Sequence, residues 1–154
     1  MAITRRLDAD LRKAIKERDR TRADCIRMLK SKLLEREVAL RSTHGTDYAI
    51  TADEALGVLT TYSKQRRESI ESFRRGGRDD LVAAEEAELE IVSGYLPEQM
   101  GEEDLRGLVE EAISETGAQS MKDLGAVMKA VMPKVAGRAD GGRVSAMVRK
   151  LLGT

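Results

Sequence analysis

Leu96-Pro97-Glu98-Gln99-Met100-Gly101 is the stretch that divides this chain of 154 residues into two regions. Proline disfavours a helical conformation at the residue before it, and Gly101 can begin a new helix. Helical hydrophobic spacing lies on both sides of the stretch. The sequence therefore predicts an N-terminal domain of long helices over residues 1–96 and a C-terminal domain of three helices over residues 97–154.

Before this linker, apolar residues recur every three or four positions, which is the spacing of amphipathic helices. The first predicted helix carries Ile3, Leu7, Leu11, Ala14 and Ile15 on one face. Further helices are predicted over residues 20–41, 51–75 and 79–95, separated by a polar loop at residues 42–50 and by Gly76-Gly77.

Polar residues at the predicted helix starts have the pattern of N-caps. Thr51, with Glu54 three residues later, predicts a capping box, in which hydroxyl and carboxylate each accept a backbone N–H. Asp19 and Asp140 can cap the second and the last helix in the simpler way. These residues place the helix starts without reference to any tertiary contact.

After the linker, helices are predicted over residues 102–116, from Ser120 to Pro133 and Gly137, and from Asp140 onward. Nowhere do apolar and polar residues alternate over five or more positions, so strands are not predicted. The predicted fold class is all-α and multihelical.

The composition excludes several classes of protein and site. A single cysteine, Cys25, and a single histidine, His44, exclude a disulfide framework and metal sites built from several cysteines or histidines. The chain shows neither the apolar stretch of a signal peptide nor an apolar run of about 18 residues that could span a membrane. We expect a cytoplasmic protein without a membrane partner.

No arrangement of residues predicts catalysis. Cys25 lies among apolar residues and is interpreted as a core thiol, and His44 lies in the polar loop, where a histidine is usually solvated. Gly76-Gly77 follows a helix rather than a strand, unlike a phosphate-binding loop. We therefore assign no catalytic residue, no metal and no cofactor.

Charge is balanced overall but uneven along the chain. The 27 basic and 27 acidic residues give a pI near 6.6, which argues against a polycation. Residues 1–42 nevertheless hold 13 basic and 7 acidic residues, whereas residues 43–96 hold 6 and 11. With only four aromatic residues among Phe, Trp and Tyr, base stacking is disfavoured, so RNA would be read through its backbone and shape. Recognition of a DNA sequence is not expected.

Two basic clusters admit two interpretations each. Lys64, Arg66 and Arg67 either form solvated i,i+4 pairs, such as Arg67 with Glu71, or contact phosphates. Residues 134–143 form either an ordinary turn with an Asp cap or an anion site of cations beside a helix start.

Five of the seven methionines lie in the last 55 residues. Methionine either fills gaps in a small core or forms an adaptable groove for a partner.

Three segments resemble the GatB/YqeY family over essentially the whole chain. They are Lys64-Gln65-Arg66-Arg67-Glu68-Ser69-Ile70, Gly94-Tyr95-Leu96-Pro97-Glu98-Gln99-Met100, and residues 125–142, which read GAVMKAVMPKVAGRADGG. The resemblance implies an all-helical protein whose C-terminal domain is similar to the tail of the B subunit of the tRNA-dependent amidotransferase, a tail that helps to hold tRNA. Where that tail usually has Gly-Lys-Ala-Asn-Pro, this chain has Gly137-Arg138-Ala139-Asp140-Gly141.

Three functions remain open at this point. The first is a non-catalytic module that binds tRNA or another folded RNA, alone or with a tRNA-charging or amidotransferase protein, through Lys129, Lys134, Arg138 and Arg143, extended by Lys64, Arg66 and Arg67. The second is a protein-interaction adaptor that uses the Met-rich tail. The third is an accessory to amide transfer from glutamine, active only with partner subunits.

Overall fold

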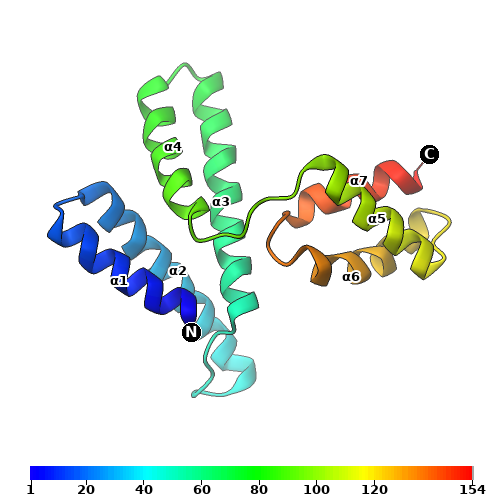
Figure 1. The fold of residues 1–154 in the computed structure, drawn as a ribbon, viewed down its shortest axis with the longest axis horizontal. Coiled ribbons are helices and arrows are strands. Elements are labelled where there is room, and N and C mark those ends of the chain that lie inside the picture. Colours follow the sequence, from blue (N-terminus) through cyan, green and yellow to red (C-terminus); the bar gives the residue numbers. More distant parts are fainter. Residues whose placement is uncertain (154) are drawn as a thin grey trace. The chain divides into compact units, whose positions relative to one another are not determined.

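The structure, a computed structural model, describes residues 1–153 and is built from seven α-helices and one 3₁₀ helix, with no strand among the residues described (Figure 1). The elements are α1 (Ala2–Lys16), α2 (Arg20–His44), α3 (Ala52–Arg75), α4 (Asp79–Ser93), α5 (Glu102–Thr116), the 3₁₀ helix η1 (Met121–Asp123), α6 (Leu124–Val135) and α7 (Gly141–Leu152). The predicted all-α class is confirmed.

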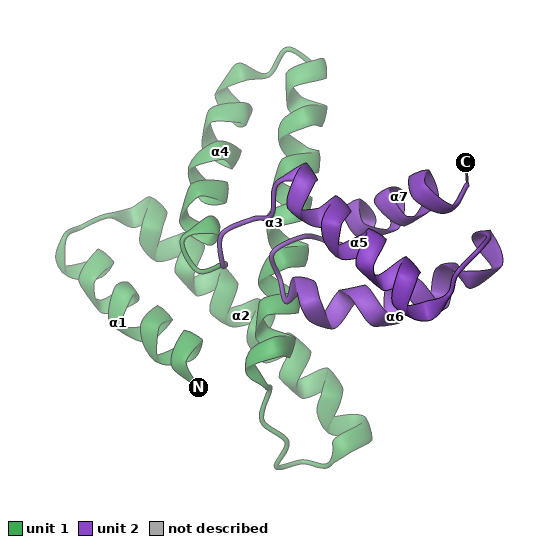
Figure 2. Cartoon of the chain, turned by 45° about the vertical axis from the view of Figure 1, so that its right-hand side comes forward, with its two compact units in different colours: residues 1–96 green, residues 97–154 purple. Residues whose placement is uncertain are grey.

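The chain forms two compact units, here called unit 1 (residues 1–96) and unit 2 (residues 97–154) (Figure 2). Unit 1 consists of two helical hairpins, α1 with α2 and α3 with α4, and α3 packs most extensively against α4 (Figure 1). Unit 2 consists of α5, η1, α6 and α7, which pack on one another.

The core of unit 1 combines aliphatic side chains with tyrosine and cysteine. Its buried members are Leu7, Cys25, Ile26, Leu29, Leu33, Ala55, Leu59, Tyr62, Val92 and Tyr95. Ile15 does not belong to it, although the spacing placed it on the buried face of the first helix; its side chain is 53% exposed. Successive residues of a helix point about 100° apart. Because the neighbouring Ala14 is fully buried, Ile15 points away from the core.

Buried polar groups connect the helices of unit 1. The Arg66 guanidinium on α3 contacts Glu85 at 3.0 Å and Glu88 at 3.5 Å on α4, and the Tyr62 hydroxyl donates to Glu88 at 3.4 Å. Tyr95, just after α4, donates its hydroxyl hydrogen to Asp10 on α1. The contacts of Arg66 and Tyr62 join α3 to α4 within one hairpin, and the bond from Tyr95 to Asp10 joins this hairpin to α1.

The core of unit 2 is aliphatic and holds no aromatic ring, because the sequence after residue 96 contains none. Its buried members are Met100, Leu105, Val109, Ala112, Val127, Val131, Val135, Ala139, Val144, Met147 and Val148. Packing of small branched side chains against two methionines is therefore the main source of its stability.

Most helix starts and stops agree with the local sequence. The Thr51–Glu54 capping box is present, and Asp19 and Asp140 each accept a backbone N–H at the start of α2 and α7. Gly117, which follows α5, adopts the left-handed conformation with φ of +67°. Caps of this kind depend on a few neighbouring residues, which is why the sequence reveals them.

Three helix ends differ from the prediction. α2 continues to His44 rather than residue 41, because the Ser42 and Thr43 hydroxyls donate to carbonyls three residues back, at 2.7 and 3.1 Å. α4 ends at Ser93 rather than residue 95, so that Tyr95 can turn inward.

The third difference concerns Pro133, which lies inside α6 instead of ending it. The proline is exposed, while Val135, two residues later, is fully buried. Packing of Val135 in the core thus carries the helix past the proline, and it ends at Ala136 and Gly137, with φ of +42° and +80°.

Candidate functional site

The basic turn between α6 and α7 is fastened to the segment that precedes α5. The Met100 N–H donates to the Arg138 carbonyl at 2.8 Å, and the Gln99 amide donates to the Gly137 carbonyl at 3.1 Å. Ala139 is buried beneath the turn. The turn therefore has a defined shape rather than the freedom of a surface loop.

Three of the cations predicted to bind phosphate already have partners within unit 2. Lys134 contacts Glu115 at 3.1 Å and Glu111 at 3.7 Å, and the hydrogen bond to Glu115 is the main reason that the pKa of Lys134 is raised. Arg143 contacts Glu102 at 3.2 Å. Arg138 donates from Nε to the carbonyl of Glu98 at 3.4 Å.

Asp140 stands where the Gly-Lys-Ala-Asn-Pro pattern has asparagine, and it is the N-cap of α7. Its carboxylate accepts the Arg143 backbone N–H at 3.0 Å and caps α7. The partial positive charge of a helix N-terminus stabilises a carboxylate at this position. The cap and the cations of the anion-site interpretation thus occupy the same turn, and the two interpretations are compatible.

Lys129, the fourth cation predicted in unit 2, is exposed on α6 and forms no ion pair with the residues that the structure describes. The structure thus separates Lys129 from the three cations that have partners. Phosphate binding by any of the four remains a prediction.

Charge in unit 2 is segregated along the chain. Residues 97–116, which include α5, hold seven acidic residues and one basic residue, Arg106. Residues 117–154, which include α6 and α7, hold seven basic and two acidic residues. The first part of the sequence of unit 2, up to residue 116, is therefore strongly acidic, and the remainder is basic.

Three exposed cations of the basic half are not among the residues predicted to bind phosphate: Lys122, Arg149 and Lys150. Arg149 donates only to the Ser145 hydroxyl within its own helix, at 3.2 Å. The net charges of residues 97–116 and 117–154 have opposite signs and nearly cancel, so the net charge of residues 97–154 does not reveal the basic half.

The methionines of unit 2 divide between the two interpretations given above. Met100 and Met147 are buried and fill the core. Met121 and Met132 are 40% and 38% exposed, and Met128 is half-buried between them. Only this second group could contact a partner.

The basic cluster on α3 also divides. Arg66 is held by Glu85 and Glu88, and its guanidinium lies 4.9 Å from the centre of the Tyr62 ring. Arg67 donates to the buried Ser63 hydroxyl at 3.1 Å rather than pairing with Glu71. Glu71 instead lies 4.0 Å from Arg75, one turn further along the same face, so the predicted Arg67–Glu71 pair is wrong. Lys64 remains exposed.

Cys25 is buried and His44 is exposed, as the sequence predicts, but His44 is the last residue of α2 rather than a residue of the loop. Cys25 is 2% exposed, and burial raises the pKa of its thiol to about 11, so it is protonated at neutral pH. His44 is exposed, with its ring centre 4.6 Å from that of Tyr48. Among residues 1–153, no group of three or more His, Cys, Asp and Glu side chains is placed to hold a metal ion.

Residues 4–152 match the family model described as Yqey-like protein. The chain belongs to this family. The resemblance seen in the sequence is thereby confirmed. A relative in Pyrenophora tritici-repentis, "Altered inheritance of mitochondria protein 41, mitochondrial", is 32% identical over 152 residues, which cover 96% of this chain and 80% of the relative.

Proteins of the same name in two yeasts match over a shorter stretch. Identity is 33% over 93 residues in Saccharomyces cerevisiae (strain S288c) and 35% over 90 residues in Eremothecium gossypii. The matched part covers 58% of this chain and 46% of each relative. This chain thus spans about half the length of its yeast relatives.

None of the described helices of this chain combines the length and the apolar character that a membrane crossing requires.

Proposed function

We propose that this protein is a non-catalytic module that binds folded RNA, of the size and shape of tRNA, through the phosphate backbone. The segregation of charge within unit 2 carries the proposal: seven basic residues follow Gly117 and seven acidic residues precede it. The basic residues of η1, α6 and α7 attract a polyanion, whereas the acidic residues of α5 repel it.

The ion pairs of the turn are compatible with this role. The side chains of Lys134 and Arg143 are 34% and 33% exposed, and their partners Glu115 and Glu102 are 54% and 73% exposed. Surface pairs of this kind contribute only about 0–1 kcal/mol, so a phosphate can replace the carboxylate at small cost. Lys129 and Lys122 need no such exchange.

The kind of RNA contact follows from the side chains that are present. Unit 2 has no aromatic ring on which a base could stack, so single-stranded recognition by stacking is disfavoured. Cations on helices contact phosphates and read the spacing of a folded backbone. The likeness of this region to the amidotransferase tail supports the same class of ligand.

Binding of tRNA measured at two salt concentrations tests the proposal, with an unrelated duplex as competitor. Replacing Lys122, Lys129 and Arg149 together by alanine should weaken binding and lower the salt slope by roughly one log unit for each phosphate that is no longer bound. Arg106→Ala, which removes a cation from the acidic half, is the matched control and should leave affinity unchanged. Equal affinity in all three proteins would overturn the proposal.

The turn can be tested by the same measurement. Lys134→Ala, Arg138→Ala and Arg143→Ala together should reduce affinity less than the triple variant on η1, α6 and α7. Each of these three residues has a partner to leave before it can contact RNA. A larger loss from the turn would place the main contact there.

A second candidate function is a protein-interaction adaptor, favoured by one observation. Met121 and Met132 are exposed, and Gly125, Met128 and Met132 share one face of α6 by helical spacing. A partner bound there would show weak salt dependence and loss on Met128→Asp, with RNA binding intact. The accessory role in amide transfer is supported by the family resemblance alone.

The compartment remains a prediction. The names of the fungal relatives state that those proteins are mitochondrial, so the RNA available to them would be organellar. For this chain we propose the cytoplasm, and fluorescence imaging of the tagged natural protein in its own cells tests it.

A further inference from the structure

Unit 1 contains a concave surface between α2 and α3 that the proposed function does not use. Its volume is about 510 Å³, and it is lined by Lys32, Arg36, Glu54, Gly57, Val58, Thr61, Tyr62 and Gln65. We call it the α2–α3 groove. No residue predicted to bind RNA lines it, so an inference about the groove is independent of the proposed function.

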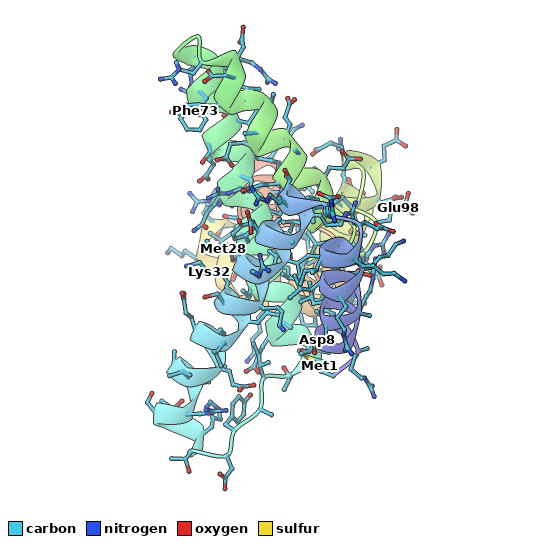
Figure 3. All side chains as sticks on the ribbon, turned by 90° about the vertical axis from the view of Figure 1, so that its left-hand side faces the viewer. Met1, Asp8, Met28, Lys32, Phe73 and Glu98 are labelled. Carbon is cyan, nitrogen blue, oxygen red and sulfur yellow. The ribbon has the colours of Figure 1, made fainter. Side chains whose placement is uncertain are left out.

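Two regular stripes form the walls. On α3, Glu54, Gly57, Thr61 and Gln65 follow one another at intervals of three or four residues, which places them on one face of the helix. On α2, Lys32 and Arg36 are one turn apart. Met28, one turn before Lys32, is 47% exposed and lies next to it in Figure 3.

The groove presents cations and hydrogen-bond donors. Arg36 forms no ion pair with the residues that the structure describes, and Lys32 pairs only with Glu35, at 3.1 Å, where the two side chains are 42% and 62% exposed. The amide of Gln65 and the hydroxyl of Thr61 add further polar groups. Excess positive charge on one wall favours an acidic ligand.

The carboxylate of Glu54 offsets part of this charge, but it is a single anion facing two cations. It accepts hydrogen bonds from the Thr51 backbone N–H at 2.9 Å and from the Tyr48 hydroxyl at 2.8 and 2.9 Å. The Thr51 bond is the main reason that the pKa of Glu54 is lowered. Glu54 is thus an internal cap of α3 that marks one end of the groove as acidic.

Gly57 is the feature that the protein's own packing does not explain. It lies within a helix of 24 residues, where glycine is unfavourable compared with alanine. A Cβ atom built at this position would meet no atom within 4 Å. Glycine here leaves space over the helix backbone, which allows another main chain to approach closely.

We propose that the α2–α3 groove is the docking site of an acidic amphipathic segment of a partner protein. Two carboxylates of the segment, spaced by one helical turn, contact Lys32 and Arg36. An apolar side chain lies between them on the half-buried Val58. The main chain of the segment passes over Gly57, within reach of the Gln65 amide.

A protein segment fits this groove better than RNA does. Its floor is apolar, and its two cations span only one helical turn, which is too short to follow a continuous phosphate backbone. The ring of Tyr62 is only 5% exposed and offers no face for a base. An amphipathic peptide uses both the apolar floor and the charged wall.

Selection from a random peptide library tests the chemistry without assuming a sequence. Peptides of about twelve residues, roughly three helical turns, are selected on the full chain and counter-selected on the Gly57→Leu variant. The retained pool should be enriched in Asp or Glu at positions four apart with Leu, Ile, Phe or Met between them. A pool without acidic enrichment would overturn the proposal.

Two controls separate docking from folding. Gly57→Leu fills the space over α3 but raises helix propensity, so the variant folds and should bind the selected peptides at least about tenfold more weakly. Gly107→Leu on α5, where a Cβ atom also meets nothing within 4 Å, should bind them as well as the unmodified chain. Equal loss in both variants would exclude the groove.

Charge reversal gives the sharpest outcome. In Lys32→Glu/Arg36→Glu the acidic peptides should bind about tenfold more weakly, and the same peptides with lysine in place of glutamate should recover affinity. Backbone amide shifts on titration should be confined to residues near 32–36 and 57–65. If these amide signals shift on addition of tRNA and not on addition of peptide, the groove is an RNA site. If they shift when only the concentration of the protein is raised, the groove binds a second copy of this chain. Either result overturns the proposal.

Discussion

In unit 1 the helices meet around side chains that have both an apolar body and a polar end, whereas in unit 2 they meet around aliphatic side chains only. Tyr62, Tyr95 and Arg66 each reach a carboxylate on another helix. In unit 2 the ion pairs lie outside the core, as those of Lys134 and Arg143 do.

The difference shows that equal charge does not imply equal availability. Arg66 and Lys134 each contact two glutamates, but Glu85 beside Arg66 is 19% exposed, whereas Glu115 beside Lys134 is 54% exposed. Removing a cation from a half-buried pair leaves a poorly solvated carboxylate, while an exposed carboxylate returns to water. Arg66 in unit 1 therefore maintains the fold, whereas Lys134 in unit 2 can exchange its carboxylate partner for a ligand.

The largest effects should come from the two cores. Leu29 and Leu105 are both fully buried, one in each unit. Each change to alanine should lower the free energy of unfolding of its own unit by about 2–5 kcal/mol, because apolar burial decreases and a cavity remains unfilled. Amide hydrogen exchange resolves the units. Loss of protection in both units from a single change would show that they do not unfold separately.

Removing the Arg66 side chain from unit 1 should have the next largest effect on the free energy of unfolding, larger than removing that of Arg143 from unit 2. Arg66→Ala should destabilise unit 1 by about 1–3 kcal/mol, because Glu85 and Glu88 lose their partner while partly buried. Arg143→Ala should cost unit 2 less than about 1 kcal/mol. Urea unfolding, followed by methyl signals assigned to each unit, measures both. Similar costs would contradict the division between structural and available cations.

Alkaline pH should destabilise unit 1 more than unit 2. Burial raises the pKa of Cys25 from 9.0 to about 11 and that of Tyr62 from 10.0 to about 12. Between the lower and the upper values the unfolded chain has lost these protons and the folded chain retains them. Stability is therefore complete below about pH 9 and should fall by on the order of 2 kcal/mol as the pH rises through 11.

Unit 2 provides the internal control for this measurement, because it contains neither cysteine nor tyrosine. Its Lys134 also has a raised pKa and loses its ion pairs at high pH, but those pairs are exposed and contribute little. Cys25→Ala should remove the part of the loss of stability that begins at the lower pH, because that part is due to the thiol. Urea midpoints of the two units that decrease equally would contradict the expectation.

The smallest effect should be a gain. Gly57→Ala should stabilise α3 by about 0.5–1 kcal/mol, because alanine is the better helix former and its methyl group meets no neighbour. Thermal unfolding followed by circular dichroism measures it, with Gly107→Ala as the equivalent change in unit 2. A loss of stability at residue 57 alone would show that the chain itself needs glycine there.

Local features of the sequence predicted much of the fold. The caps at Thr51, Asp19 and Asp140 depend on atoms three residues away, so reading the sequence is sufficient to find them. Of the two residues predicted to end α6, Gly137 follows its last turn, whereas the burial of Val135 overrides the local effect of Pro133. Tertiary packing decides such cases, and the spacing of apolar residues along the sequence does not reveal which contacts will form.

The candidate sites were less predictable than the fold. The cations of the turn could be named from the sequence, but their partners Glu102, Glu111 and Glu115 belong to another helix. The α2–α3 groove needs residues eighteen or more positions apart to lie side by side. Gly57 in a predicted helix was its one local signal, and glycine alone does not say what fills the space.

The uneven distribution of aromatic rings has a practical consequence for spectroscopy. Every tyrosine and the one phenylalanine precede residue 97, and the chain has no tryptophan. Near-ultraviolet absorbance and intrinsic fluorescence therefore report on unit 1 and are blind to unit 2. Binding of RNA to unit 2 would leave the tyrosine fluorescence of unit 1 unchanged after correction for the absorbance of the RNA itself, and a tryptophan introduced at an exposed position of α7 would make that event visible.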